Sequence, residues 1–539
     1  MADSTERGDL EPGSGGPALA RRVFDAVRRE NGFACVADLF SELENAGLAR
    51  SDRRLRETAE RASAVDGDAP LDFEAFRRLL ADENLAHVHR AVSGEMVIRD
   101  FAGFKNRIAA IFEYCGEIRD GEVASYIPQL ARVDPDRYAL AVCTADGQQF
   151  SFGDDAETYC VQSTCKPILY ALALDTLGRR TVHAHVGREP SGRSFNELTL
   201  NAQGLPHNPM INAGAIMCSS LIKPGKPLAD RFDFVMGAWR GLAGERSAGF
   251  DNAVFLSEKE TADRNFALAY FMRENNAFPP DTDIIKTLDF YFQNCSITVD
   301  VRQMAVIAST LANGGVCPLT NKRIFNAETV KDCLSLMYSC GMYDFSGEYA
   351  FTVGIPAKSG VSGALLMVVP GVCGFALWSP RLDKLGNSVR GVEFSKRLVD
   401  VFAFHTYANM VTDHRLIDPT RAAGAQADED ATRLCAAAAR GDVGEIRRLV
   451  AVGVDVDVAD YDRRTAMHLA ASEGRTAVVD FLIAQGADAF PKDRWGATPL
   501  DDARREGRKA IADRLEALRS GGAPEPTEDA VGKPASIID

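Results

Sequence analysis

Ser163-Thr164-Cys165-Lys166 forms an S-x-x-K string, and Lys358-Ser359-Gly360, much later in the chain, forms a K-[ST]-G string. The first pattern recurs at Ser220-Leu221-Ile222-Lys223, where it runs directly into Pro224-Gly225-Lys226-Pro227. Proline and glycine there predict a loop, so no helix would hold the second lysine beside its serine. The K-[ST]-G pattern occurs once. The copy at Ser163 is therefore the candidate for chemistry.

The residues around Ser163 predict a hairpin followed by a helix. Residues 138–144 and 148–152 are typical of two strands joined by the turn signal Ala145-Asp146-Gly147. Pro167 fits the first turn of a helix, and residues 168–177 are helical in composition up to Gly178. Ser163 and Lys166 then lie on one helical face, close enough to touch.

This spacing is compatible with a reactive serine. The positive end of the helix lies beneath the serine oxygen. A lysine that is partly desolvated and near other positive charge loses pKa and acts as a base. A serine that caps the helix beside an exposed lysine explains the same residues equally well, so the local pattern leaves both interpretations open.

The second string supplies a possible partner. Residues 364–369 and 375–378 read as strands joined by Pro370-Gly371, which places Lys358 on an edge strand next to the helix that bears Ser163. Such a lysine favours an anion or tunes Lys166, unless it is a solvated residue at a strand end. In this order, the two strings match the signatures of serine β-lactamases and penicillin-binding proteins, which work by acyl transfer through a covalent seryl intermediate.

Longer blocks carry a more specific resemblance. Residues 126–419 resemble the serine-dependent glutaminases, which hydrolyse L-glutamine to L-glutamate and ammonia. The matching blocks are residues 126–130, 160–167, 207–216, 257–258, 263–266, 289–293, 312–315, 340–347 and 356–361. The order of regions resembles that of kidney- and liver-type glutaminases. The implied fold class is α+β, with a β-lactamase/transpeptidase-like catalytic domain, an all-α N-terminal region and C-terminal ankyrin repeats.

The resemblance also implies roles for individual residues. Ser163 would attack the side-chain amide carbon, Lys166 would take its proton, and Tyr291, with Tyr343, would relay protons. The backbone N–H groups of Ser163 and Val361 would form an oxyanion hole. The amino-acid end of glutamine would be held by a set that suits a zwitterion: Tyr126, Asn212, Glu258, Asn265 and Tyr343. Lys358 would play a supporting part.

Each of these residues also has a plain structural explanation. Asn212 fits a turn or cap. Glu258 and Asn265, about two turns apart on one expected helix, fit a helix surface, and Tyr291 and Tyr343 fit a half-buried core. Taken together and in order inside matching blocks, the residues favour the functional interpretation.

Composition narrows the class of protein. The chain has 539 residues, 46% of them hydrophobic and 25% charged, with a net charge of −15. These values are ordinary for a soluble globular protein, and the absence of a basic stripe argues against nucleic-acid binding. No apolar run reaches the roughly 18 residues of a membrane span, and the acidic N-terminus lacks a signal-peptide core. We expect a cytoplasmic protein.

Neither a metal nor a cofactor is expected. The twelve cysteines are scattered without a C-x-x-C pair, and the pairs His87/His89 and His183/His185 lack nearby metal-ligating partners. Asp66-Gly67-Asp68 hints at a calcium loop, but Leu71 stands where glycine is required and Arg77 where glutamate is required. The resemblance implies activation by inorganic phosphate.

The C-terminal region repeats. Thr432, Thr465 and Thr498 are 33 residues apart, and so are the glycines at 441, 474 and 507 and those at 453 and 486. This is the ankyrin period, and about three units fit. The stack serves either a protein partner or self-assembly.

These patterns predict the order of regions. We expect a disordered segment over 1–17, a helical EF-hand-like region without calcium over 18–122, a catalytic domain over 123–418, a linker over 419–431, ankyrin repeats over 432–519 and a disordered tail over 520–539. The resemblance implies a homo-oligomer, from dimer to tetramer or filament. Two other functions remain: a β-lactamase-like acyl hydrolase, and an ankyrin scaffold with an inactive enzyme domain.

Overall fold

The computed structural model describes residues 16–192, 197–410, 416–421, 425–451 and 454–520. The chain divides into two compact units, which are described separately. The first comprises residues 1–407 with 418–420, and the second comprises residues 408–417 with 421–539.

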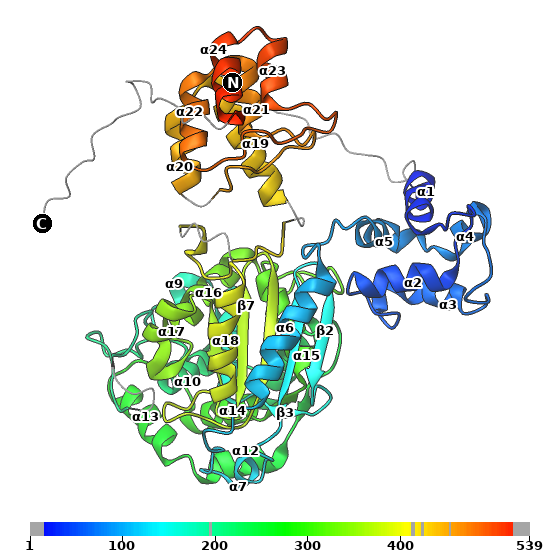
Figure 1. The fold of residues 1–539 in the computed structure, drawn as a ribbon. Coiled ribbons are helices and arrows are strands. Elements are labelled where there is room, and N and C mark those ends of the chain that lie inside the picture. The colour runs from blue at the N-terminus through cyan, green and yellow to red at the C-terminus, as the bar shows by residue number, and fades with distance from the viewer. Residues whose placement is uncertain (1–15, 193–196, 411–415, 422–424, 452–453, 521–539) are drawn as a thin grey trace, which may run out of the picture. The chain divides into compact units, whose positions relative to one another are not determined.

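The first unit begins with the expected helices (Figure 1). The elements are α1 (Gly16–Val27), α2 (Val36–Asn45), η1 (Arg53–Leu55), α3 (Arg56–Ala62), α4 (Phe73–Leu79), η2 (Asp82–Asn84), α5 (Leu85–Val92) and α6 (Phe101–Gly116). Helix α1 buries Ala20, Val23, Phe24 and Val27, the spacing of one helical face. The loops before α2 and α4 are joined by paired backbone hydrogen bonds between Ala34 and Leu71, so two helix–loop–helix segments form one small core.

A five-stranded antiparallel sheet organises the rest of this unit. Its strands are β1 (Ala139–Thr144), β2 (Gln149–Gly153), β6 (Ala357–Ser359), β7 (Ala364–Val369) and β8 (Cys373–Trp378), in the order β2-β1-β8-β7-β6. The predicted hairpin and the edge position of Lys358 are therefore confirmed. All residues of β1, β7 and β8 are buried, which explains why these strands, apart from Thr144 at the end of β1, do not alternate between apolar and polar residues.

Helices cover both faces of this sheet. On one face α15 (Val301–Ala312) packs so closely that a Cβ on Gly374 would lie 2.4 Å from Ala308 Cβ. On the other face lies α18 (Val389–Val401), whose Gly391 backbone meets Leu365 and Leu377, alongside α6 (Figure 1). The sheet is thus enclosed between helices on both of its faces.

The remaining elements form a helical layer around the functional residues. They are α7 (Pro128–Ala131), β3 (Tyr159–Cys160), η3 (Gln162–Cys165), α8 (Lys166–Leu177), α9 (Arg179–Val182), α10 (Asn212–Leu221), α11 (Leu228–Leu242), β4 (Gly249–Phe250), α12 (Asn252–Glu260), α13 (Asp263–Glu274), α14 (Ile284–Cys295), β5 (Ile297–Val299), α16 (Ala327–Cys340), η4 (Tyr343–Phe345) and α17 (Ser346–Thr352). The short strands pair in the order β3-β5-β4. Helix α8 is buried from Lys166 to Leu174, so it is the centre of this layer.

The second unit is a stack of helix pairs. Its elements are η5 (Ala408–Met410), α19 (Ala425–Arg440), α20 (Val443–Ala451), α21 (Ala466–Glu473), α22 (Thr476–Ala484), α23 (Pro499–Arg505) and α24 (Lys509–Arg519). Gly441, Gly474 and Gly507 have φ of 82°, 76° and 69°, which explains their period, because each ends the first helix of a pair in a left-handed turn. Thr465 and Thr498 begin α21 and α23 as N-caps.

Some expectations about this layout need correction. Helix α19 starts at Ala425, so the stretch 419–431 expected as a linker is partly helical, and Thr432 lies inside that helix instead of capping it. Helix α1 already includes residues 16 and 17, which were expected to be disordered. The other residues expected to be disordered, 1–15 and 521–539, and Gly453 lie outside the described residues.

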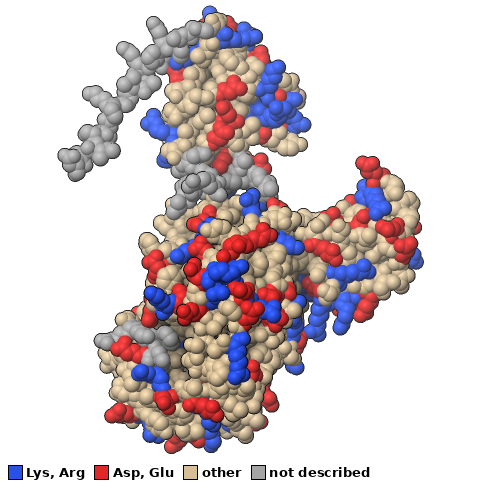
Figure 2. Space-filling view, turned by 60° about the horizontal axis from the view of Figure 1, so that its bottom comes forward, with Lys and Arg blue, Asp and Glu red and all other residues tan. Residues whose placement is uncertain are grey.

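Acidic and basic side chains are interspersed on the face shown in Figure 2. That face therefore carries no continuous band of either sign. Within the described ranges, no helix combines the length and the apolar character needed to cross a membrane.

Candidate functional site

The backbone before Ser163 is held in an unusual conformation. Gln162 follows the short strand β3 with a φ of 46°, the left-handed region that non-glycine residues rarely adopt. The hydroxyl of Thr164 donates to the Val161 carbonyl at 2.6 Å, which tightens the turn of η3. The predicted helix follows directly as α8, with Pro167 in its first turn and Gly178 at its end. Ser163 is thus placed on a constrained turn at the start of a buried helix.

Lys166 is fully buried, and its amine joins a network built on Asn212. Lys166 Nζ donates to Asn212 Oδ1 at 2.7 Å, and the Tyr291 hydroxyl donates to the same oxygen at 3.3 Å. Asn212 Nδ2 in turn donates to Asn265 Oδ1 at 3.2 Å. Burial lowers the pKa of Lys166 to about 8. The arrangement therefore holds a lysine that is partly neutral near pH 8, as a base must be.

The Lys166 geometry refines the expectation drawn from the spacing. Ser163 and Lys166 lie one helical turn apart, yet the Lys166 amine hydrogen bonds to Asn212. The Ser163 side chain is close enough to the Tyr343 phenol to lower the pKa of that phenol. Ser163 therefore has Tyr343 as well as Lys166 among its neighbours.

A second cluster surrounds Glu258, which is 8% exposed. Its Oε1 accepts from the Tyr126 hydroxyl at 2.5 Å and from Gln162 Nε2 at 3.0 Å. Burial raises the pKa of this carboxyl, and the hydrogen bonds from Tyr126 and Gln162 oppose that rise. A buried carboxylate without an arginine or lysine hydrogen bonded to it in the described residues suits a cationic ligand.

Tyr343 completes the site from a third direction. It begins η4 with a φ of 54° and is buried. Burial raises the pKa of its phenol, and the contacts with the Ser163 side chain and with the backbone of Val361 act against that rise. Val361 follows β6 in a turn, so its backbone N–H lies in the part of the site where Ser163 and Tyr343 meet.

Lys358 lies on the predicted edge strand, but the contacts of its amine were not predicted from the sequence. Its Nζ donates to the carbonyl oxygens of Gly341 at 3.0 Å and Ser359 at 2.6 Å, and it lies 4.4 Å from the centroid of the Tyr343 ring. Burial and the nearby positive charge of Lys166 hold the pKa of Lys358 well below its ordinary value. The amine therefore contacts the backbone behind Tyr343, and the alternative of a solvated residue at a strand end is wrong.

The structure brings most of the predicted site residues together and adds one that sequence reasoning missed. Glu258 and Asn265 were expected on one helix, but the chain breaks between α12 and α13, so each residue arrives on its own helix. Gln162 was not among the expected site residues. The one hint in the sequence is that Gln162 directly precedes Ser163. The backbone φ that directs the Gln162 side chain toward Glu258 is set by the surrounding fold.

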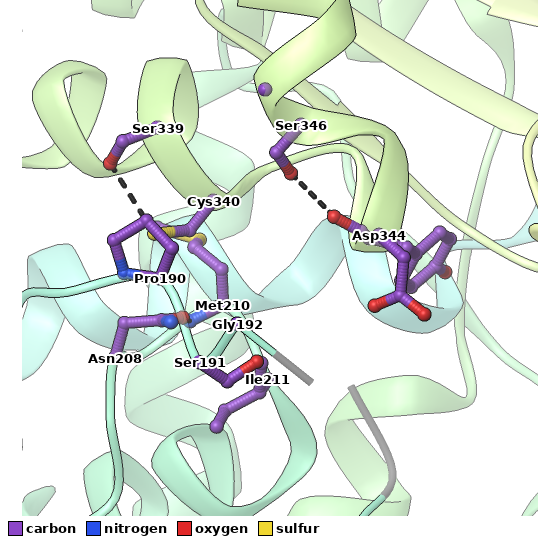
Figure 3. A pocket seen from close by; sticks show the side chains of 12 residues that line it. Pro190, Ser191, Gly192, Asn208, Met210, Ile211, Ser339, Cys340, Asp344 and Ser346 are labelled. Atoms are coloured by element: carbon purple, nitrogen blue, oxygen red, sulfur yellow. Dashed lines mark hydrogen bonds between the residues drawn. The ribbon is translucent and has the colours of Figure 1, made fainter. Parts of the chain in front are cut away.

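A cavity of about 460 Å³ adjoins Tyr343. In Figure 3, Ser339 and Cys340 from the end of α16 face Pro190, Asn208 and Met210 across this space, and Asp344 and Ser346 lie along its other side. Tyr343 lines the cavity, whereas Ser163 and Lys166 are not among its lining residues.

Comparison with known proteins matches two family models to this chain. The model described as Glutaminase covers residues 121–407, and the model described as Ankyrin repeats (3 copies) covers residues 415–517. All of the site residues described above fall within the first range.

Individual relatives agree with these models. The liver isoform of mitochondrial glutaminase from Rattus norvegicus is 47% identical over 84% of this chain and 76% of its own length. A glutaminase from Nostoc sp. is 44% identical over 54% of this chain and 87% of its own length. A solved structure named Probable glutaminase ybaS aligns with a TM-score of 0.53 and 35% identity, over 55% of this chain and 95% of that one.

Proposed function

This chain belongs to the glutaminase family of amidohydrolases, and we propose that it opens the side-chain carboxamide of L-glutamine through a covalent ester on Ser163. The proposal rests on three features that come together around Ser163. Ser163 directly precedes the buried helix α8, its side chain is close enough to the Tyr343 phenol to lower the pKa of that phenol, and Lys166 lies one helical turn further on with a pKa of about 8.

The first half of the reaction forms the ester. Ser163 Oγ attacks the carboxamide carbon while its proton passes to Lys166, with Tyr343 beside the path. The backbone N–H groups of Ser163 and Val361 donate to the oxyanion. When the tetrahedral intermediate collapses, the C–N bond breaks and the nitrogen leaves as ammonia after taking a proton relayed by Tyr291. The glutamyl group then remains as an ester on Ser163.

The second half releases glutamate. A water molecule gives its proton to the same base and attacks the ester carbon, and the C–O bond to Ser163 breaks as the serine recovers a proton. Lys166 and Tyr291 suit this reversible exchange because both hydrogen bond to Asn212 Oδ1. The proton can thus be held close to the reacting atoms in both halves.

Substrate selection would rest on the α-amino and α-carboxyl groups. Glu258, with Tyr126 and Gln162 hydrogen bonded to it, would pair the ammonium group. Asn212, Asn265 and Tyr343 offer amide and phenol donors for the carboxylate. A shorter amino acid such as asparagine would not bring its carboxamide to Ser163 while both of these ends are held.

The experiment measures ammonia released by the purified protein from glutamine and from asparagine, without ATP. Wild-type protein should act on glutamine, and Ser163→Ala should lose the activity. Ser220→Ala is the matched control, since Ser220 belongs to the second S-x-x-K copy and its hydroxyl donates to the Met217 carbonyl within α10. A diazo-ketone glutamine mimic should label Ser163. Retained activity in Ser163→Ala, or labelling elsewhere, would refute the mechanism.

The same preparation separates the other functions. A chromogenic β-lactam should not be hydrolysed while glutamine is. Absence of any turnover would favour the scaffold with an inactive enzyme domain. Light scattering tests the predicted homo-oligomer, and kinetics with and without inorganic phosphate test the predicted activation.

The ankyrin partner and the cytoplasmic location also stay predictions. The rat relative has a name that places it in mitochondria, so fractionation of cells that express this chain is the direct measurement.

A further inference from the structure

We propose that Lys358 is a positioning residue, whose amine holds the backbone and ring of Tyr343 so that the tyrosine hydroxyl meets Ser163. This inference rests on the proposed function, because it concerns how Tyr343 is held beside the serine that the proposed reaction uses. It differs from the two roles predicted for Lys358, which were to favour an anion or to tune Lys166.

The hydrogen bonds of the Lys358 amine go to the backbone. Its Nζ donates to the carbonyls of Gly341 at 3.0 Å and Ser359 at 2.6 Å, and the side chain is fully buried. The third neighbour is the face of the Tyr343 ring, at 4.4 Å from its centroid. The amine therefore connects the end of α16, the edge strand β6 and the Tyr343 ring.

The segment that Lys358 holds is packed against β6 without spare room. The Gly341 carbonyl also accepts from the Ser359 N–H at 3.1 Å. A Cβ on Gly341 would lie 1.8 Å from the Ala357 carbonyl oxygen, so only glycine permits this approach. The Lys358 and Ser359 bonds thus fasten one carbonyl, two residues before Tyr343, from two sides.

Tyr343 needs such support because its backbone is strained. A bulky residue at φ 54° is in a disfavoured conformation, which persists only where its surroundings enforce it. Ser346 contributes from the following turn, since its Oγ accepts from the Met342 N–H at 3.0 Å and donates to the Tyr343 carbonyl at 2.7 Å. Without Lys358, the turn can relax and carry the phenol away from Ser163.

The competing explanation is electrostatic. The charge of Lys166 lowers the pKa of Lys358, so removal of Lys358 could act in turn by shifting the titration of Lys166. The two explanations differ in what they predict. If Lys358 positions Tyr343, the activity lost in a Lys358 variant depends on the presence of the Tyr343 hydroxyl. If Lys358 instead tunes Lys166, the activity lost depends on pH.

The test is a double-mutant cycle between Lys358→Met and Tyr343→Phe, read as kcat at saturating glutamine and as the pH profile of kcat/KM. Methionine keeps an unbranched chain without donors. We expect each single variant to lower kcat by roughly 100-fold and the double variant to be no slower than the slower single variant. The midpoint of the pH profile should not move in Lys358→Met. Effects that multiply, or a shifted midpoint, would overturn the proposal.

A second cycle protects the test against misfolding of a variant with a buried change. Ser346→Ala is a smaller change, which removes one hydroxyl from the same buried turn, and it should also be non-additive with Tyr343→Phe. If Lys358→Met does not fold, the cycle between Ser346→Ala and Tyr343→Phe tests the proposal, and additive effects in that cycle overturn it. Labelling of Ser163 by the diazo-ketone separates the two levels. If Ser163 is labelled and the cycles are additive, only the positioning role of Lys358 is rejected. If Ser163 is not labelled, the proposed function is rejected.

Discussion

At the scale of the residue, burial sets the chemistry of Lys166. The side chain has no exposed surface, and its amine donates to Asn212 Oδ1. Because burial disfavours the charged form, the pKa of Lys166 is lowered to about 8. An ordinary surface lysine would be almost wholly protonated at that pH and unable to accept the Ser163 proton.

The pH dependence follows from that pKa. Lys166 has to be neutral to accept the proton, so kcat/KM should rise with pH through a midpoint near 8 and fall tenfold per unit well below it. The measurement is glutamine hydrolysis between pH 6 and about 9.5. Lys223→Ala, in the second S-x-x-K copy, should keep the wild-type profile. A midpoint near the ordinary lysine range would show that Lys166 is not the base.

Glu258 should control binding more than chemistry. Glu258→Gln keeps the shape of the side chain and removes the charge proposed to pair the substrate ammonium. We expect KM for glutamine to rise by about 100-fold, the loss typical of a buried charged pair, with a smaller change in kcat. Glu260→Gln is the control, since Glu260 ends the same helix and is exposed. An unchanged KM in Glu258→Gln would place the ammonium elsewhere.

At the scale of the element, the start of α8 follows from local rules and its neighbours do not. Pro167 and Gly178 mark the two ends of the helix, as the sequence predicts. By contrast, the break between α12 and α13 has no comparable signal, because Thr261-Ala262 contains neither proline nor glycine. Tertiary packing therefore decided where α12 ends, and it also decided that Asn265 on α13 faces Asn212.

The turn between α16 and η4 gives a test of close packing. Gly341→Ala would place a Cβ 1.8 Å from the Ala357 carbonyl, so β6 or the turn must move. We expect the free energy of unfolding to fall by about 1–3 kcal/mol. We also expect a lower kcat, since Tyr343 lies two residues after Gly341. Thermal melting and glutamine turnover measure the two effects. Gly347→Ala is the control, because a Cβ there meets nothing within 4 Å, and equal melting of the two variants would contradict the argument.

At the scale of the whole molecule, the N-terminal helices are joined to the catalytic sheet by polar contacts at one turn. Gln148 is buried at the β1–β2 turn, and its amide donates to the carbonyls of Ala46 and Ile98 while its oxygen accepts from the Ile98 N–H. Arg54 adds bonds to the carbonyls of Asp146 and Gly147, both at 2.7 Å. The helical region and the sheet are thus parts of one compact unit.

Gln148→Ala tests this connection. It leaves three buried backbone groups without their partner, which should cost about 1–3 kcal/mol. Urea unfolding of the full chain, followed by tryptophan fluorescence and circular dichroism, should show a lower midpoint. Gln149→Ala is the control, since the Gln149 link to Gly47 uses its backbone N–H, which the substitution keeps. An unchanged midpoint in Gln148→Ala would mean that the two parts stabilise each other through other contacts.

What the sequence alone determined was local or periodic. The S-x-x-K spacing, the hairpin turn and the 33-residue glycines each depend on a few neighbouring φ and ψ angles, and the structure has them where they were expected. Only the tertiary structure decided that Gln162 turns toward Glu258, that Asn212 bridges Lys166 and Tyr291, and that Lys358 supports Tyr343. These contacts join residues 15 to 96 positions apart, so they depend on how separate elements pack, which no local pattern encodes.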